Sequence, residues 1–191
     1  MTETARQAAL YTMQDALLEE TEVIVPSPKR FVREALVMPD GYRLDWYYVD
    51  TPPSVMVVPF TADGSVILVR QYRHNLKRYT LECPAGTVGA GEDLADAAAR
   101  ELEEETGFTL AAGAEFQHVG AFCSLPSETN KYTNIFRADP VVESGPAHLD
   151  TEIEKYFDMS VVVMPLAAAV KSIGDSIVGT ETITALTLAS R

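Results

Sequence analysis

The segment from Gly86 to Phe108, GTVGAGEDLADAAARELEEETGF, is the part of the sequence that says most about the structure of this chain. It opens with several glycines, and from residue 94 onward it contains residues that favour helices. Asp93 is a typical N-cap, and Asp96 three residues later resembles the acidic half of a capping box. Gly107 suits the left-handed conformation that ends many helices. The segment therefore predicts a loop, a helix and a second loop.

The predicted helix carries four glutamates within residues 101–105. Glu101 and Glu105 share one helix face and Glu104 lies beside them, whereas the side that can pack inward holds Leu94, Ala97, Ala98 and Leu102. Like charges four residues apart cost a few tenths of a kcal/mol in an isolated helix. A solvated acidic face is one interpretation. A cation site is the other, because Mg²⁺ binds one or two protein carboxylates together with water and phosphate oxygens.

The residues around the glutamates favour the cation site. Five residues separate Gly86 from Glu92, and seven residues separate Glu92 from the tripeptide Arg-Glu-Leu. One residue then precedes the pair Glu-Glu, and one more residue precedes the pair Gly-Phe. This pattern resembles the box of the Nudix hydrolases, and a chance match at these nine positions is on the order of one in a million. The resemblance implies an α/β/α sandwich with a mixed sheet. It also implies hydrolysis of a nucleoside diphosphate linked to another group, with two to three Mg²⁺ or Mn²⁺ ions.

The resemblance assigns roles to the charged residues of the box. Glu101 and Glu105 are expected to be the main metal ligands, and Glu104 a further ligand or a group acting through water. Glu104 and Glu105 are thus also candidate catalytic residues. Arg100 is expected to orient a neighbouring glutamate through a charge-assisted hydrogen bond. Glu92 is expected to be structural.

A second stretch, SVILVRQYRHNLKRYTLECPAG, is similar to the ADP-ribose pyrophosphatase branch of the family. The residues that carry this similarity are Arg70 to Arg73 (RQYR), Glu82 and Pro84 to Gly86 (PAG). The resemblance implies that the Ala85 carbonyl oxygen binds a metal ion and that Arg73 and Glu82 contact the substrate. An arginine suits a diphosphate. A surface ion pair is the alternative for Arg73.

The stretch DWYYVDTPPSVMVVPF, residues 45–60, matches the same branch. In relatives an N-terminal antiparallel sheet swaps across a two-fold homodimer and contributes an aromatic side chain to the nucleobase. Trp46 is the candidate for this stacking role and a third substrate-binding residue. A dimer-interface or core position is the alternative for Trp46.

Two stretches depart from the branch. In SLPSETNKYTNIF, Ser127 replaces a glycine and Lys131 stands near a position where an acid is common. The late loop AHLDTEIEKYFDMSVVV has Lys155 and Phe157 at the usual acidic positions. Glu154 is therefore the candidate catalytic carboxylate of this loop, ahead of Glu152, and a solvated loop acid is the alternative.

The remaining sequence predicts an α/β fold in two parts. The break at TPPS separates residues 1–53, an N-terminal extension with antiparallel strands, from residues 54–191, the Nudix domain. Residues 4–20 are a possible amphipathic helix. Strands are expected at 30–38, 42–49, 55–61, 65–72, 80–84, 116–122, 132–138 and 157–163, and further helices at 165–173, with Pro165 as the first helical residue, and 181–189.

The composition of the chain limits its possible partners and its cellular location. The net charge of −13 argues against nucleic-acid binding. Two cysteines do not form a disulfide framework, and we expect neither a signal peptide nor a membrane span. We therefore expect a cytoplasmic protein, and the resemblance to the ADP-ribose pyrophosphatase branch implies a homodimer.

We expect hydrolysis of ADP-ribose, or of a related nucleoside diphosphate sugar, to a nucleoside monophosphate and a sugar phosphate. The alternatives are GDP-mannose or NADH as substrate, a non-catalytic nucleotide sensor, and a hydrolase of oxidised nucleotides, which the RQYR strand disfavours.

Overall fold

The computed structural model describes residues 13–26, 30–148 and 156–190. The chain forms two compact units. The first contains the described residues up to Thr51 together with Leu125–Asn130, and the second contains Pro52–Ser124 and the described residues from Lys131 onward.

The first unit is built on a three-stranded antiparallel sheet in the order β1 (Leu17–Val25), β2 (Arg30–Val37) and β3 (Arg43–Asp50). A single 3₁₀ turn, Met13–Asp15, precedes β1. Gly41 takes a positive φ of 86° in the turn between β2 and β3, where glycine adopts this conformation without steric cost. These strands confirm the antiparallel pair expected at residues 30–38 and 42–49.

The helix predicted for residues 4–20 is wrong for its described C-terminal part. Residues 17–20 belong to β1 and pair with β2, and residues 4–12 lie outside the described part of the chain. The β1 strand continues into TEVIV, whose β-branched residues favour extended backbone. Pairing with β2 supplies the backbone hydrogen bonds that a weakly periodic helix would otherwise make internally.

The second unit contains the remaining strands. One sheet has the order β7 (Ala85–Thr87), β4 (Ser54–Pro59), β10 (Thr133–Ala138) and β9 (Phe116–Phe122). Another has the order β12 (Ser160–Pro165), β5 (Ser65–Arg73) and β6 (Arg78–Glu82), and β11 (Val141–Glu143) pairs with β8 (Phe108–Leu110). A short 3₁₀ turn, His74–Leu76, joins β5 to β6. β4 is parallel to β10, and the other pairs are antiparallel, so the fold has the expected mixed pairing.

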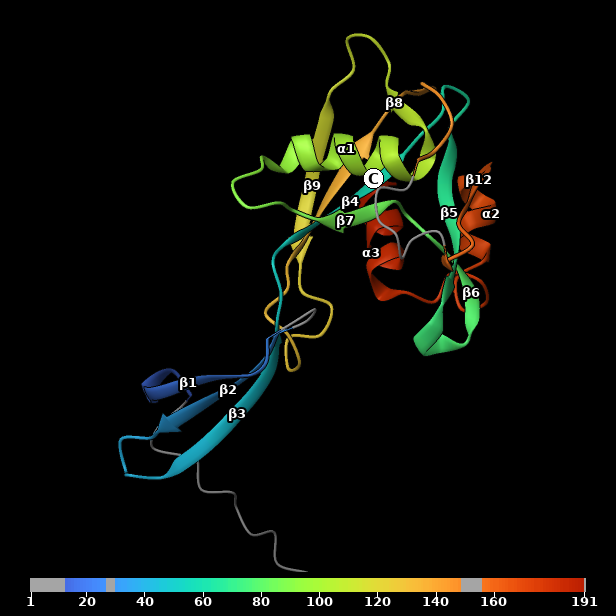
Figure 1. Cartoon of the computed structure of the whole chain (residues 1–191). Coiled ribbons are helices and arrows are strands. Elements are labelled where there is room, and N and C mark those ends of the chain that lie inside the picture. The colour runs from blue at the N-terminus through green and yellow to red at the C-terminus, as the bar shows by residue number, and fades with distance from the viewer. Residues whose placement is uncertain (1–12, 27–29, 149–155, 191) are drawn as a thin grey trace, which may run out of the picture. The chain divides into compact units, whose positions relative to one another are not determined.

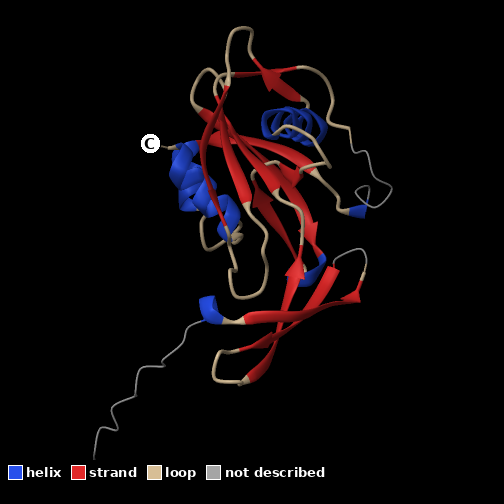
Figure 2. Cartoon of the chain, turned by 90° about the vertical axis from the view of Figure 1, so that its left-hand side faces the viewer, coloured by secondary structure: helices blue, strands red, loops and turns tan. Residues whose placement is uncertain are grey.

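Helices cover both faces of the central sheet (Figures 1 and 2). Val55 and Val57 of β4 belong to the apolar cluster that contains α1 (Leu94–Thr106). Met56 and Val58 belong to the cluster that contains α3 (Thr180–Ala189) and Ala169 of α2 (Leu166–Lys171). Because successive strand residues point to opposite faces, β4 is buried on both sides. This confirms the expected sandwich.

The caps of α1 follow the sequence. Asp93 has extended backbone, and its side chain accepts a hydrogen bond from the Ala95 N–H at 2.8 Å. Gly107 ends the helix with a φ of 71°. Pro165 is the N-cap of α2 and the last residue of β12, one position before the expected N1 site. Among the described residues no helix is long and apolar enough to cross a membrane.

Candidate functional site

Glu101 is a nearly buried carboxylate on the sheet-facing side of α1. Only 8% of the residue is exposed, and it lies between Ala97, Ala98 and Leu102, all buried. Its carboxylate lies directly against Gly86, so that a Cβ at residue 86 would overlap it. The glycine that opens the box thus leaves the space that the Glu101 carboxylate fills. The first residue of the motif and a glutamate of its helix meet at this point.

Arg100 binds three glutamates of the box. Its Nη1 donates to Glu101 Oε1 at 2.7 Å and to Glu104 Oε2 at 3.1 Å. Its Nε donates to Glu92 Oε1 at 2.9 Å, and its Nη2 donates to Glu92 Oε2 at 3.1 Å and to the Thr87 carbonyl at 3.2 Å. The hydrogen bond with Glu92 is the largest cause of the raised pKa of Arg100, and it lowers the pKa of Glu92. Arg100 therefore joins the loop before α1 to the carboxylates on α1.

Glu105 links α1 to the segment before the box. Its Oε2 accepts a hydrogen bond from the Ala85 N–H at 3.0 Å. Ala85 is the first residue of β7 and pairs with Met56 of β4. The sheet therefore fixes the position of the Ala85 backbone relative to α1.

The donor set of these residues suits a hard divalent cation, because it consists of carboxylate oxygens and one nearby carbonyl. The carboxylates of Glu101 and Glu104 converge on a single positively charged nitrogen, Arg100 Nη1. The charges of both carboxylates are therefore offset by one cationic side chain. Among residues 13–26, 30–148 and 156–190, however, no group of three or more His, Cys, Asp or Glu side chains is arranged to hold a metal.

Arg73 and Glu82 form a two-point ion pair across β5 and β6. Arg73 Nε donates to Glu82 Oε1 at 2.8 Å and Nη2 donates to Oε2 at 2.5 Å, while Thr80 Oγ1 also donates to Oε1 at 2.6 Å. Burial acts to raise the pKa of Glu82, but the hydrogen bonds and charge of Arg73 outweigh it and leave the pKa lowered. The structure thus shows the ion pair that was the alternative interpretation of Arg73.

The charges of Glu105 and Glu181 also act on Arg73. Both contribute to its raised pKa, after the larger effect of Glu82. Glu181, in the first turn of α3, had no sequence signal that marked it as functional. Its Oε1 accepts hydrogen bonds from Thr133 and Ser124, and it forms an ion pair with Lys131.

Trp46 belongs to the first compact unit. It is 42% exposed, which excludes a core position. It lines a pocket in this unit. The other lining residues are Glu34 and Tyr48 of the sheet and Pro126, Thr129 and Asn130 of the segment Leu125–Asn130. Tyr48 Oη donates to Glu34 Oε1 at 3.1 Å. An exposed aromatic ring in a pocket leaves a stacking role open.

The late-loop candidates Glu154 and Glu152 lie outside the described residues, as does Lys155. Phe157 is described, and its carbonyl accepts a hydrogen bond from the Tyr72 N–H at 2.8 Å. The catalytic role of Glu154 stays a prediction.

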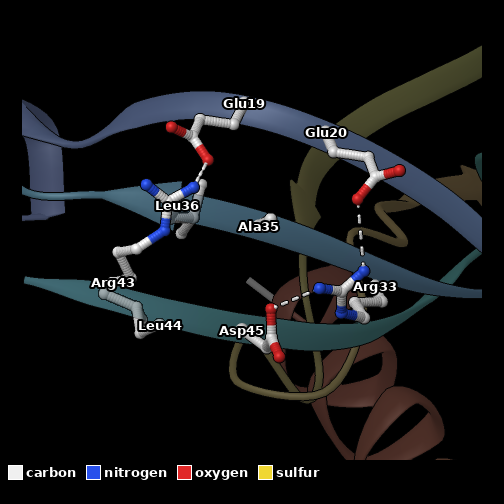
Figure 3. A pocket seen from close by; sticks show the side chains of 8 residues that line it. All are labelled: Glu19, Glu20, Arg33, Ala35, Leu36, Arg43, Leu44 and Asp45. Atoms are coloured by element: carbon white, nitrogen blue, oxygen red, sulfur yellow. Dashed lines mark hydrogen bonds and ion pairs between the residues drawn. The ribbon is translucent and has the colours of Figure 1, made fainter.

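A groove across the first sheet is lined by charged residues (Figure 3). Arg33 pairs with Asp45 at 2.9 Å and with Glu20 at 3.4 Å, and Arg43 pairs with Glu19. The hydrogen bond with Asp45 is the largest cause of the raised pKa of Arg33. Because these arginines and acids pair with one another across neighbouring strands, the groove is a structural ion-pair network.

Comparison with known proteins identifies the class. A family model described as the NUDIX domain matches residues 50–176. The ADP-ribose pyrophosphatase of Bacillus subtilis (strain 168) is 34% identical over 106 residues, which are 56% of this chain and 56% of that protein. The ADP-sugar pyrophosphatase of Mus musculus is 43% identical over 70 residues, 37% of this chain and 31% of that protein. The chain therefore spans little more than half the length of the first relative and less of the second.

A solved structure described as that of an ADP compounds hydrolase has the same fold. The TM-score is 0.77 at 24% identity, and the match covers 94% of this chain and 95% of that chain. The sandwich, the box geometry and the family match define a Nudix domain. This chain belongs to the NUDIX family, and its similarity to ADP-ribose pyrophosphatases, expected from RQYR and PAG, is confirmed.

Proposed function

We propose that this protein hydrolyses the pyrophosphate bond of ADP-ribose or of a related nucleoside diphosphate sugar. For ADP-ribose the products would be AMP and ribose 5-phosphate. The observation that carries the proposal is the convergence of Glu101 and Glu104 on Arg100 Nη1, beside the contact of Glu105 with the Ala85 N–H. This arrangement gathers several carboxylate oxygens near the C-terminal end of α1, where that helix meets β7. It suits the binding of cations that in turn bind a diphosphate.

Glu101, Glu104, Glu105 and the Ala85 carbonyl are the residues that would hold Mg²⁺ or Mn²⁺. When bound, such ions would supply Lewis-acid activation of a water molecule and electrostatic stabilisation of the charge that develops in the transition state. The chain's own residues set the geometry. Arg100 holds Glu101 and Glu104 in position, and Glu92 holds Arg100 from the opposite side.

We assign substrate contacts to Arg73, Glu82 and Trp46. Arg73 would bind the diphosphate through its Nη1, because its Nε and Nη2 are both bound to Glu82. Glu82 would keep Arg73 oriented and accept a hydrogen bond from a substrate hydroxyl or amino group. Trp46 would stack on the nucleobase. Glu154 would accept or position the proton of the attacking water.

We also propose that the protein is a homodimer joined through its N-terminal sheet. This sheet exposes several large apolar side chains, and Phe31 stacks on Tyr47 with ring centroids 6.0 Å apart. Phe31 is 38% exposed and Tyr47 is 46% exposed. Exposed apolar residues on neighbouring strands favour an interface with a second copy.

A product assay with Mg²⁺ tests the proposed activity. ADP-ribose, ADP-glucose, GDP-mannose and NADH are offered separately, and nucleoside monophosphate is measured. Preference for ADP-ribose supports the proposal, and preference for GDP-mannose or NADH retains the chemistry but changes the substrate. Binding of ADP-ribose without product would contradict hydrolysis and favour a nucleotide sensor.

A further inference from the structure

Glu181 and Lys131 form a polar cluster where α3 begins. Glu181 Oε1 lies 3.3 Å from Lys131 Nζ, 3.0 Å from Thr133 Oγ1 and 3.4 Å from Ser124 Oγ. All three donors therefore meet at one carboxylate oxygen. In the part of the chain that the structure describes, the other oxygen of Glu181, Oε2, makes no hydrogen bond. The Glu181 side chain is 28% exposed, so ligands can reach it.

A hydrogen bond of Thr182, the residue next to Glu181, connects this cluster to the candidate site. Thr182 is buried, and its Oγ1 accepts a hydrogen bond from the Cys83 N–H at 3.1 Å. Cys83 follows Glu82 directly and lies two residues before Ala85. The first turn of α3 is therefore anchored to the segment that carries a proposed substrate contact and a proposed metal ligand.

A second connection between the cluster and the candidate site consists of side-chain hydrogen bonds and strand pairing in the sheet. Thr133 Oγ1, which donates to Glu181, also lies 3.0 Å from Ser54 Oγ. Ser54 of β4 pairs with Thr133 of β10 on one side and with Thr87 of β7 on the other. Thr87 is the last residue of β7, and its carbonyl accepts from Arg100. Glu181 is thus connected to the candidate site from two independent directions.

The charge at Glu181 decides which part of a substrate it suits. A carboxylate repels the phosphates that Arg73 and bound cations would attract, but it readily accepts hydrogen bonds from hydroxyl groups. The ammonium of Lys131 holds this carboxylate in place and offsets its charge. A neutral, hydroxyl-rich ring beside the diphosphate matches this chemistry.

We propose that Glu181 is a specificity-determining residue that accepts a hydrogen bond from a hydroxyl of the sugar, and that Lys131 is the positioning residue that orients its carboxylate. The inference rests on the proposed hydrolysis of nucleoside diphosphate sugars and names the part of the substrate that this cluster selects. Lys131 is also a position at which the sequence departs from its branch, so the pair would give this chain its own sugar preference.

The test compares two substrates that differ only in the ring. KM and kcat are measured for ADP-ribose and for the β-methyl ester of ADP, which keeps the diphosphate but has no sugar beyond it. Glu181→Gln retains a similar shape and is expected to raise KM for ADP-ribose about tenfold, the effect of weakening one charge-assisted hydrogen bond. The kinetic constants for the methyl ester should stay unchanged. Glu115→Gln, at an exposed residue in the same unit, is the matched control.

Lys131→Gln provides a second variant if Glu181→Gln does not fold, as judged by thermal unfolding. It should raise KM for ADP-ribose in the same direction, again without an effect on the methyl ester. Equal losses on both substrates, or no loss on either, would overturn the inference while leaving the proposed function intact. Failure of the wild-type protein to hydrolyse any nucleoside diphosphate sugar would instead overturn the proposed function, and the inference with it.

Discussion

The carboxylate of Glu101 occupies the space in which a side chain at residue 86 would stand. The two residues belong to different elements, β7 and α1, and the absence of a Cβ at Gly86 lets a charged group lie almost buried against the strand. Arg100 neutralises that group from the other side. The requirement for glycine at this position is therefore steric and concerns the proposed ligand set directly.

Gly86→Ala is expected to displace the Glu101 carboxylate. The added methyl group would meet only the end of the flexible Glu101 side chain, so the expected loss of unfolding free energy is about 1 kcal/mol, the low end of the cost of overpacking. Metal binding should weaken at the same time, because the displaced carboxylate is a proposed ligand. Mn²⁺ titration by calorimetry and chemical unfolding measure the two effects.

Gly145→Ala is the matched control for this substitution. A Cβ at Gly145 meets nothing within 4 Å, and its φ lies outside the left-handed region. Unfolding free energy and Mn²⁺ affinity should both stay close to wild type in the control. Equal Mn²⁺ affinity in Gly86→Ala and the wild type would contradict the proposed role of Glu101.

Glu105→Gln is expected to lower kcat by about two or more orders of magnitude, because loss of a charged group at a site that stabilises the transition state commonly costs that much. The fold should remain intact, since glutamine can still accept the hydrogen bond from the Ala85 N–H. Steady-state rates with ADP-ribose and Mg²⁺ provide the measurement. Glu103→Gln, on an exposed position of the same helix, should retain wild-type rates. Wild-type turnover in Glu105→Gln would exclude the assigned role.

The Arg73–Glu82 ion pair predicts a pH-dependent contribution to stability. The pKa of Glu82 in the folded state is lowered from 4.5, so folding favours the ionised form. This contribution is present above the unfolded-state pKa and is lost as the pH falls through the lower folded-state pKa. The wild type should therefore exceed Glu82→Gln in unfolding free energy by about 1–3 kcal/mol at pH 7.

The difference between the wild type and Glu82→Gln should shrink steadily as the pH falls below 4.5. Urea unfolding across pH 3 to 7, a range chosen to bracket the reference pKa of glutamate, measures it. A difference that stays constant, or that grows toward low pH, would show that the charge of Glu82 does not stabilise the fold.

The proposed dimer predicts that a charge on the N-terminal sheet will separate the two copies. Phe31→Asp places a carboxylate beside Tyr47, where it would be desolvated in an apolar interface. Sedimentation velocity should show a dimer for the wild type and a monomer for this variant. Leu76→Asp, at a residue that is 53% exposed in the other unit, should remain a dimer. A monomeric wild type would contradict the dimer.

Local sequence was sufficient where local interactions dominate. The caps Asp93 and Gly107 and the alternation of Ala97, Ala98 and Leu102 with charged residues predicted α1 with its observed ends. The helix predicted at residues 4–20 was wrong for its described part, because residues 17–20 pair with β2. The local sequence carries no signal of this pairing. Periodicity is weak there, and pairing with another strand decides the outcome.

The family, the box and the residue types that the proposed chemistry needs can all be inferred from the sequence, because these depend on spacing within one short segment. Which of these groups lie in contact depends on the packing of the whole domain. Thr133 pairs with Ser54 across 79 residues of chain, Thr182 reaches Cys83 across 99, and Glu181 comes within 3.3 Å of Lys131. Such contacts follow from how two helices and several strands pack together around β4. No spacing in the sequence encodes them, since each depends on burial of apolar surface by the whole domain.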